Sequence, residues 1–377
     1  MTVVVTQNNI TSDNANITAL TASTVNSLKY PDAGPLSNRN LVQNGAMTIS
    51  QRTTSTSSLT SGNNFILDRW RTYIQDIGTY TISQASDAPT GFRYSYKIQC
   101  TTADASPAAA DDMSFYCAYE GQDFQHLKKG TASAQSVTLS FWVKSNKTTT
   151  GQVNFRDLDN SRMISGTYTI NSAGTWEYKT ITFAGDTSGV LDNDNAASIS
   201  LQWYLDSGSN FTSGSLNSSW GTDTTANRNV NNFGLASSTS NYWQITGIQL
   251  EVGTVATPFE HRSYGDELAR CKRYFQATEI SNFGLPGYAI SSTQARFCAS
   301  FFPEMRDDPT LTTDTLANFA VQYTNSSATT TDMVFSGVSQ NNARIIATVS
   351  SGLTAGQGVS LLGQNVSFPK LYYSAEL

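Results

Sequence analysis

The chain has 377 residues, of which 14% are charged, and its formal net charge is −6. This length predicts about two domains, because single hydrophobic cores rarely grow past about 250–300 residues. The negative charge argues against nucleic acid or an anionic membrane as the main partner, since phosphates are neutralised by clustered Lys and Arg. Ser, Thr, Asn, Gln and Gly replace the missing charges, and 17 Tyr, 18 Phe and 6 Trp can fill hydrophobic cores. We therefore expect a folded, mainly β protein with a polar surface.

Residues 1–36 are polar, with isolated aliphatic residues and two prolines near the end of the segment. Ile10, Ile17 and Leu20 fit the a and d positions of a heptad, but polar residues fill the other positions, which argues against a coiled coil. We expect an N-terminal arm or stem that packs against identical copies or a larger assembly, with a flexible tail as the alternative. Neither a signal peptide nor a membrane-spanning run is expected here, since a basic start and a long apolar stretch are both missing.

Residues 37–262 contain segments in which apolar and polar residues alternate, as in β-strands with one buried face. The clearest are FRYSYKIQC (92–100), SVTLSFWVK (136–144) and ASISLQWYL (197–205). Their expected buried faces are Phe92, Tyr94, Tyr96, Ile98 and Cys100, then Val137, Leu139, Phe141 and Val143, then Ile199, Leu201, Trp203 and Leu205. Turn clusters such as NSAGTW separate these strands at short intervals, which favours a β-sandwich.

One long stretch, residues 206–234, interrupts this pattern with Ser, Thr, Asn and Gly. A loop of this length in a compact domain is usually functional or mobile. Trp220 lies within it, and its ring either fastens the loop to the sandwich or contacts a ligand.

Residues 263–276 predict a connecting helix. Ser263 is a suitable N-cap, and Tyr264, Leu268, Cys271 and Phe275 recur every three or four residues to form one apolar stripe. The stripe must pack on something, so these four residues are candidate contacts, together with Ile10, Ile17 and Leu20. They would join either two domains of one chain or several chains.

Residues 277–377 form a second strand-rich region of domain size, ending in KLYYSAEL, which we expect to pair in a sheet. Cys100, Cys117, Cys271 and Cys298 have no metal-binding spacing, and we expect four buried free thiols.

Glycans are recognised by aromatic faces together with amides, hydroxyls and carboxylates, and several residues of these types are expected on solvent-facing sides of strands or in loops. The candidate carbohydrate-binding residues are Trp142, Lys144, Tyr204 and Trp220 in the sandwich, and Tyr288, Tyr323, Asn341 and Arg344 at the tip of the distal region. For Trp142 and Tyr204, cover by a second layer or a neighbouring subunit is the alternative.

Catalytic residues are not assigned. A glycosidase needs two carboxylates facing one cleft, and the candidates Glu120 with Asp123, Asp157 with Asp159, and Glu177 are explained equally well as strand-end or turn residues. His126 and His261 lie in charged turns that we expect to be exposed. Asp192 and Asp194 are candidate calcium ligands in a turn; no other cofactor is expected.

Five stretches carry a resemblance to a known family: NLVQNGAMTISQR, LDRWRTY, SFWVKSN, NSAGTWEYKTITFAGDTSG and ITGIQLEVGTVATPFEHRSYGDELARCKRYFQ. They resemble tail-fibre or tail-associated adhesin proteins of tailed bacteriophages, common in marine phages, over roughly residues 39–276. FFPEMRDDPTL resembles the start of that family's variable distal domain.

The resemblance implies a jelly-roll-like sandwich, similar to a carbohydrate-binding module, in a homotrimeric virion protein. Host attachment through a bacterial surface glycan, without catalysis, is the expected function, with residues 1–36 docking on other virion proteins. The alternatives are a structural capsid fibre or decoration protein without a receptor role, and a polysaccharide depolymerase. We expect the protein on the virion, at the tail or the capsid surface.

Overall fold

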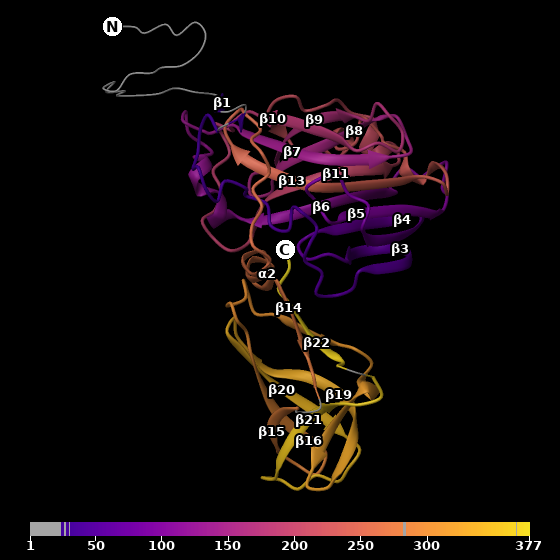
Figure 1. Ribbon diagram of the computed structural model, residues 1–377, viewed down its shortest axis with the longest axis vertical. Helices are drawn as coiled ribbons and strands as arrows, with labels where there is room; N and C mark the ends of the chain where they lie inside the picture. Colours follow the sequence, from indigo (N-terminus) through magenta and orange to yellow (C-terminus); the bar gives the residue numbers. More distant parts are fainter. Residues whose placement is uncertain (1–23, 26–27, 30, 282–283, 367) are drawn as a thin grey trace, which may run out of the picture.

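The computed structural model describes residues 24–25, 28–29, 31–281, 284–366 and 368–377 (Figure 1). Ile10, Ile17 and Leu20 lie outside these residues. The fold is mainly β, as predicted: a large sandwich is followed by one short helix and a smaller β domain. None of the described helices has the length and apolarity needed to cross a membrane.

The sandwich consists of one continuous curled sheet with the strand order β10-β7-β13-β5-β4-β6-β11-β8-β9-β12, in which β3 also pairs with β4. Its strands are β3 (Ser55–Phe65), β4 (Arg71–Ala85), β5 (Ser95–Thr102), β6 (Asp112–Glu120), β7 (Val137–Ser145), β8 (Thr150–Asp157), β9 (Arg162–Thr169), β10 (Glu177–Phe183), β11 (Ala197–Ser207), β12 (Gly221–Thr222) and β13 (Tyr242–Val252). Short elements connect them: α1 (Ser209–Thr212), η1 (Gly121–Leu127), η2 (Thr225–Asn227) and η3 (Leu235–Ser237). The strand β1 (Thr24–Val25) pairs with β2 (Leu28–Lys29) in a separate two-stranded sheet.

Strand β4 divides the sheet into two layers because it changes partner along its length. Residues 71–75 pair with β6, and residues 79–85 pair with β5. Between them, Asp76 and Gly78 have φ values of 52° and 66°, which bend the strand. One layer therefore contains β10, β7, β13 and β5, and the other contains β6, β11, β8, β9 and β12.

The alternation expected from the sequence is confirmed in these strands. The buried face of β7 is Val137, Leu139, Phe141 and Val143, and that of β11 is Ile199, Leu201, Trp203 and Leu205. Between the layers, Phe115 stacks on Trp70 with ring centroids 4.7 Å apart and also contacts Trp203 and Trp243. Such aromatic contacts add to the free energy of burial, so this cluster holds the two layers together.

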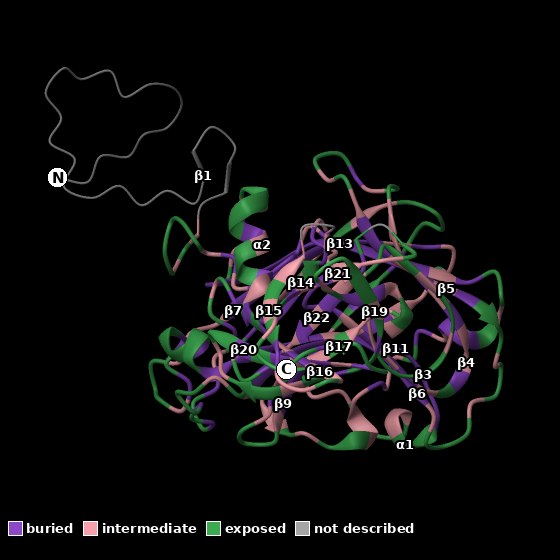
Figure 2. Ribbon diagram, turned by 90° about the horizontal axis from the view of Figure 1, so that it is seen from below, coloured by how far each residue is buried: buried purple, intermediate pink, exposed green. Residues whose placement is uncertain are grey.

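The helix α2 (Tyr264–Lys272) begins as predicted, since Ser263 Oγ accepts a hydrogen bond from the Asp266 N–H at 3.2 Å. It is shorter than predicted, because Phe275 already belongs to β14 (Phe275–Glu279) and pairs with the C-terminal strand. Its buried residues are Glu267 and Cys271, whereas Tyr264 is 63% exposed. Figure 2 shows most of α2 in the colour of exposed residues.

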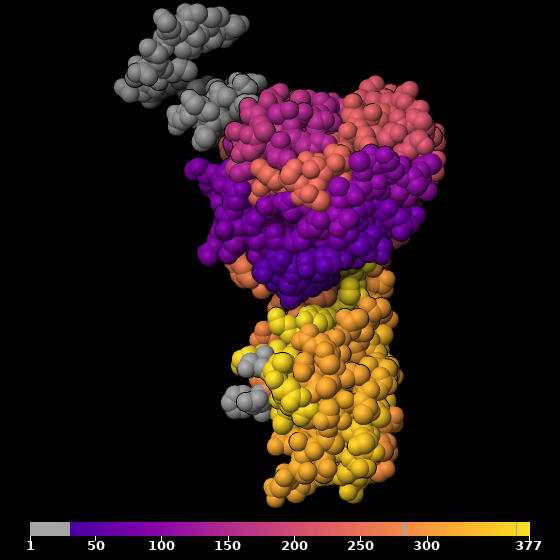
Figure 3. Space-filling view, turned by 90° about the vertical axis from the view of Figure 1, so that its right-hand side faces the viewer, coloured from indigo at the N-terminus to yellow at the C-terminus, as the bar shows by residue number. Residues whose placement is uncertain are grey.

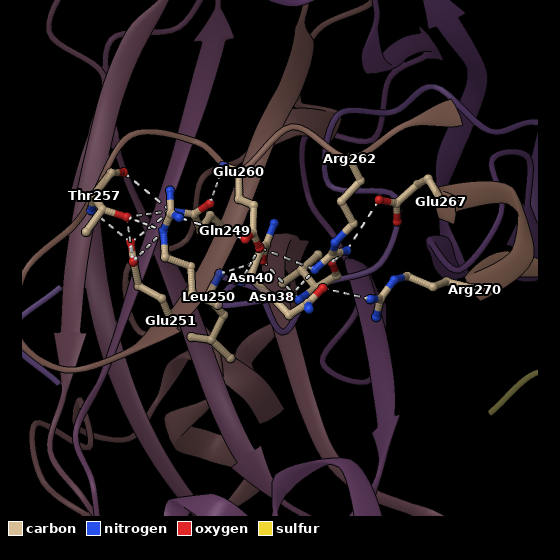
Figure 4. Close-up of polar contacts among 12 residues, drawn as sticks. Asn38, Asn40, Gln249, Leu250, Glu251, Thr257, Glu260, Arg262, Glu267 and Arg270 are labelled. Carbon is tan, nitrogen blue, oxygen red and sulfur yellow. Dashed lines mark hydrogen bonds and ion pairs between the residues drawn. The ribbon is translucent and has the colours of Figure 1, made fainter. Parts of the chain in front are cut away.

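Buried and half-buried polar contacts position α2 against the segment that enters the sandwich (Figure 4). Glu267 accepts a hydrogen bond from the Asn44 N–H at 2.5 Å, and Arg262 donates to the carbonyl oxygen of Val42 at 2.9 Å. Glu260 accepts from the Asn40 N–H at 3.0 Å. The strand–Pro–helix stretch is therefore fastened to residues 40–44, more than 200 positions earlier in the chain.

The smaller domain combines a closed barrel with a three-stranded sheet, β14-β22-β17. The barrel follows the order β15 (Leu285–Ala289), β16 (Gln294–Ser300), β20 (Asn342–Val349), β19 (Ser326–Val338), β18 (Phe319–Tyr323) and β21 (Gly358–Gly363). The remaining elements are β17 (Thr310–Thr313), η4 (Leu316–Asn318) and β22 (Lys370–Ser374). This domain has its own hydrophobic cluster, which includes Phe297, Phe319, Ile345 and Leu361.

The prediction of four buried thiols is wrong for Cys298, which is exposed, while the other three cysteines are buried. On β16, Ala295, Phe297 and Ala299 face the barrel core. Period-two alternation therefore turns Cys298 outward.

The two domains form an elongated molecule, with the wide sandwich on the narrower barrel domain (Figure 3). Their junction is polar and partly buried. Glu120 accepts hydrogen bonds from Arg273 at 2.7 Å and from the Tyr274 hydroxyl at 2.6 Å. Arg306 donates to the carbonyl oxygen of Asn195, whose side chain donates back to the Arg306 carbonyl oxygen.

Candidate functional site

An aromatic pocket opens on the outer face of the layer that contains β7, β10 and β13. Because the odd-numbered residues of β7 face the core, Trp142 and Lys144 face outward. Tyr178 of β10 lies directly opposite Trp142 in the strand register, and their ring centroids are 5.3 Å apart. The pocket has a volume of about 590 Å³. Its lining residues are Thr90, Gly91, Phe92, Trp142, Tyr178, Gly247, Ala256, Thr257, Pro258, Phe259 and His261.

Gly247 keeps this pocket open. The register of β13 with β7 shifts between Thr246 and Gln249, and Gly247 has a φ of +63° in this bulge. A Cβ atom there would lie 2.7 Å from Cζ of Phe92 and 3.1 Å from Cδ1 of Trp142. A larger residue would therefore displace the rings that form the pocket.

Three further rings form the opposite wall. Phe92 contacts Phe259 with centroids 5.0 Å apart, and His261 contacts Phe259 at 4.8 Å. Phe259 and His261 follow Pro258 in the strand–Pro–helix stretch, where Thr257 is held by a 2.7 Å hydrogen bond to Glu251. The stretch that resembles a phage family thus also builds one wall of the pocket.

Phe92 corrects a prediction. Alternation placed Phe92 and Tyr94 on the buried face of a strand, but β5 begins at Ser95, and both rings are only half-buried. Phe92 instead belongs to the loop after β4. The adjacent TG dipeptide at residues 90–91 is the turn signal that could have indicated an earlier end of the strand.

A polar cluster adjoins the aromatic pocket. The carboxylate of Asp87 accepts hydrogen bonds from Lys144 Nζ at 2.8 Å, Trp176 Nε1 at 3.2 Å and Gln244 Nε2 at 3.4 Å. Burial raises the pKa of Asp87, but the hydrogen bonds from Lys144 and Trp176 outweigh this and hold the pKa below its ordinary value. Asp87 is therefore an anion at neutral pH, and its side chain is still 49% exposed.

The polar cluster and the aromatic pocket form one surface, which we call the outer-face site. Lys144 lies two residues after Trp142 on the same strand face, about 7 Å along the strand. Two other segments also contribute to both parts of this surface. Trp176 lies two residues before Tyr178, and the loop between β4 and β5 contains both Asp87 and Phe92. Chemically, the surface offers ring faces beside a charged acceptor and a charged donor.

Tyr204 and Trp220 do not join this site, because they lie on the other layer. Tyr204 is 2% exposed and lies against Phe211, with ring centroids 5.9 Å apart. Trp220 donates from Nε1 to the Ala184 carbonyl oxygen at 2.6 Å, and Lys129 Nζ lies 3.9 Å from its ring centroid. Trp220 therefore fastens the long loop to the sandwich, one of the two roles considered for it.

The four candidates in the smaller domain do not converge on its tip. Tyr288 and Tyr323 pair with Gly358 and Val359 of β21 and lie near the end of the barrel away from the sandwich. The carbonyl oxygen of Asn341 accepts from the Phe301 N–H at the opposite end. Arg344 is exposed on the side of the barrel, opposite Cys298. The hairpin that joins β19 and β20 turns toward the sandwich. The prediction that Asn341 and Arg344 lie at the tip is therefore wrong.

Three of the candidate catalytic carboxylates, Glu120, Asp157 and Glu177, have structural partners. Glu120 is buried and binds Arg273 and Tyr274. Asp157 lies 3.1 Å from Lys129 Nζ, and Glu177 accepts from the backbone N–H groups of Asn171 and Ser172 and from Lys179. His126 and His261 are exposed, as expected.

The two candidate calcium ligands also take part in turn hydrogen bonds. Asp194 Oδ1 accepts from the Ala196 N–H at 2.9 Å, and the N–H of Asp192 donates to Asp159. In the part of the chain that the structure describes, no three His, Cys, Asp or Glu side chains are grouped to hold a metal ion. Calcium binding at Asp192 and Asp194 stays a prediction.

No family model and no curated protein sequence matches the chain. Among solved structures, the enzymatically active domain of tailspike protein 4 of bacteriophage CBA120 is 14% identical, with a TM-score of 0.29; the match covers 56% of this chain and 21% of the tailspike. A putative sugar binding protein from Bacteroides thetaiotaomicron is 10% identical, with a TM-score of 0.30, and the match covers 57% and 100%. A carbohydrate-binding module described as TmCBM61, solved in complex with β-1,4-galactotriose, has the same identity and TM-score, with 57% and 99% covered. The strand pairing of the chain itself defines its sandwich.

Proposed function

We propose that this protein binds a glycan at the outer-face site without cleaving it. The observation that carries the proposal is the juxtaposition of Trp142 and Tyr178 with the Asp87–Lys144 pair on one open surface. A sugar ring has an apolar C–H face and a rim of hydroxyl groups. The aromatic rings match the former. The exposed carboxylate of Asp87 and the half-buried ammonium group of Lys144 match the latter.

The non-catalytic character is part of the proposal. Glycoside hydrolysis needs two carboxyl groups on either side of the scissile bond. Among the described residues that line the aromatic pocket or form the polar cluster, Asp87 is the one carboxylate, and its pKa is lowered rather than raised. A general acid needs the opposite shift. These features favour binding over depolymerisation.

We further propose that the protein is a bacteriophage fibre or tail component that attaches the virion to a bacterial surface glycan. The sequence resemblance over roughly residues 39–276 supports this narrower assignment. In the same proposal the chain is a homotrimer, residues 1–36 dock on other virion proteins, and the exposed face of α2 at Tyr264 and Leu268 joins the copies. The exposure of Tyr264 in the single chain is what an oligomer contact requires.

The test is a glycan array of bacterial surface polysaccharides probed with the full chain and with Trp142→Ala and Tyr178→Ala. We expect binding by the full chain and at least a fivefold loss of affinity in each variant, since a stacked ring contributes about 1 kcal/mol or more, which corresponds to about fivefold. Phe368→Ala is the matched control, because this aromatic residue is 55% exposed in the other domain.

Three other results would overturn parts of the proposal. Binding that is unchanged in both variants would show that the glycan does not bind at the outer-face site. Absence of glycan binding, with no adsorption of the protein to host cells, would favour a structural capsid fibre or decoration protein. Release of soluble oligosaccharides from host polysaccharide would establish a depolymerase.

A further inference from the structure

A second hollow lies on the opposite layer of the sandwich, where the long loop leaves part of the outer face uncovered. We call it the strand groove. Its volume is about 370 Å³. Its lining residues are Asn63, Arg71, Tyr73, Gln75, Asp112, Tyr116, Arg156, Gln202, Tyr204, Phe211 and Arg228.

Two neighbouring strands form the floor of the strand groove. Arg71 of β4 pairs with Tyr116 of β6, Tyr73 with Ser114, and Gln75 with Asp112. All these positions alternate with core residues such as Ile74 and Phe115, so their side chains point out of the sandwich. Four residues of extended chain separate the ends of the floor, which corresponds to about 13 Å. This is the length of a short oligosaccharide rather than of one sugar ring.

The long loop forms the wall. Gln152 and Asn154 of β8 donate to the carbonyl oxygens of Asn227 and Arg228, each at 2.8 Å, and this fixes the loop over β8. Arg156 and Arg228 both bind Asp223, with distances of 2.5 Å and 2.8 Å. The loop therefore brings two arginines to the groove, but their charge is partly neutralised.

Arg71 is different, because its charge is not matched. Among the described residues its guanidinium contacts two rings, with centroid distances of 3.8 Å to Tyr116 and 5.6 Å to Phe65, but it has no hydrogen bond or ion pair. Burial lowers the pKa of Arg71 to about 10, so it remains a cation at neutral pH. Its nitrogen atoms are not among the buried polar atoms that lack a partner, so they are accessible from the groove and can bind an acceptor that a ligand brings.

Asp112 is the complementary group at the other end of the floor. It is 5% exposed, and its carboxylate has no hydrogen-bond donor among the residues that the structure describes. Buried carboxylates are normally hydrogen-bonded, so this group is an acceptor without a donor. The charged residues that line or support the groove are Arg71, Arg156, Arg228, Asp112 and Asp223. The groove therefore has one positive charge in excess, although the net charge of the chain is −6.

We propose that the strand groove is a second binding site, distinct from the outer-face site, and that it takes an acidic oligosaccharide. A sugar carboxylate binds Arg71, a hydroxyl group several rings away donates to Asp112, and the rings of Tyr73 and Tyr116 support the sugar faces between them. Planar guanidinium groups bind carboxylates with two parallel hydrogen bonds, which distinguishes an acidic sugar from a neutral one.

Calorimetric titration of the full chain tests this site with oligogalacturonate and oligomannuronate, each compared with its carboxyl-reduced, neutral counterpart. We expect at least one acidic probe to bind at least tenfold more tightly than its neutral counterpart. Arg71→Gln should abolish the difference, Arg71→Lys should keep part of it, and Trp142→Ala should leave it unchanged.

The inference is overturned if neither acidic probe exceeds its neutral counterpart, a comparison that needs no variant. It is also overturned if Arg71→Gln keeps the preference or if Trp142→Ala removes it. Loss of array binding in Trp142→Ala together with an intact acidic preference would separate the two sites. Binding that depends on Trp142 without any acidic preference would leave the proposed function standing and reject the second site.

Discussion

The carboxylate of Glu376 lies 2.7 Å from Nη1 of Arg69, although 307 positions separate the two residues. Their side chains are 5% and 1% exposed, and Arg52 approaches the same carboxylate at 3.2 Å. The guanidinium of Arg69 also stacks on Tyr274, 3.4 Å from the ring centroid. The end of the barrel domain is thereby inserted into the sandwich, so the two domains should unfold together rather than independently.

Glu376→Gln should destabilise the protein by about 3–5 kcal/mol, because it leaves Arg69 buried without a counter-charge. The measurement is the free energy of unfolding from denaturant titration. Asp307→Asn is the control, since its side chain is 55% exposed and its ion pair lies at the surface. Equal stabilities of the two variants would contradict a structural role for the buried pair.

The same pair predicts acid sensitivity. Burial raises the pKa of Glu376, but Arg69 and Arg52 outweigh this and hold it below the ordinary value of 4.5. A carboxyl group with a lowered pKa stabilises the folded state above its unfolded pKa, and this contribution is lost as the pH falls toward the folded pKa. The difference in unfolding free energy between the native chain and Glu376→Gln should therefore be constant above about pH 5 and shrink below about pH 4.

Asp112 should show the opposite pH dependence. Burial raises its pKa to about 6, against a smaller opposing effect of Arg228, while the nearby Asp111 raises it further. Its contribution to stability is present below its ordinary pKa of 3.8 and is lost as the pH rises through about 6. Asp112→Asn should therefore stabilise the protein at pH 7 by about 1–3 kcal/mol and have little effect at pH 4. Thermal unfolding at both pH values measures this, and a destabilised variant at pH 7 would refute it.

Gly247→Ala should close the outer-face site. The new methyl group would meet Phe92 and Trp142 at a φ of +63°, so we expect a loss of about 1–3 kcal/mol in stability and of glycan binding. Gly62→Ala is the matched control: Gly62 has a φ of +81°, but nothing lies within 4 Å of the position that the new methyl group would occupy. If both variants lose the same stability and both still bind, the steric role of Gly247 is wrong.

If the proposed trimer forms through α2, Leu268→Asp and Tyr264→Asp should convert it into monomers, because each places a charge in the contact between copies. Light scattering coupled to size-exclusion chromatography gives the mass directly. Val190→Asp, at a residue that is 62% exposed in the sandwich, should leave the trimer intact. A native chain that is monomeric at micromolar concentration would reject the proposed assembly.

Much of the fold follows from the sequence because alternation is a local property. The inward faces of β7 and β11 can be read from residues 137–143 and 199–205, and Ser263 marks the start of α2 without reference to any other segment. The same alternation predicted that the side chains of Trp142 and Lys144 face outward. The bounds of an element are less well determined by the local sequence. Phe92 was predicted to lie in a strand and Phe275 in the helix, but pairing with distant strands decides where β5 and β14 begin.

By itself, the sequence determined a mainly β chain with a polar surface and a single capped helix, because side-chain period and capping act between near neighbours. Only the tertiary structure decided which outward residues meet. It brought Asp87 to Lys144 and Phe92 to the pocket of Trp142, and it joined Arg69 to Glu376. It also placed Arg71 on Tyr116 with no counter-ion among the residues that the structure describes. Those contacts arise from strand order and the bend in β4, and no local pattern encodes which distant segments a curled sheet will place side by side.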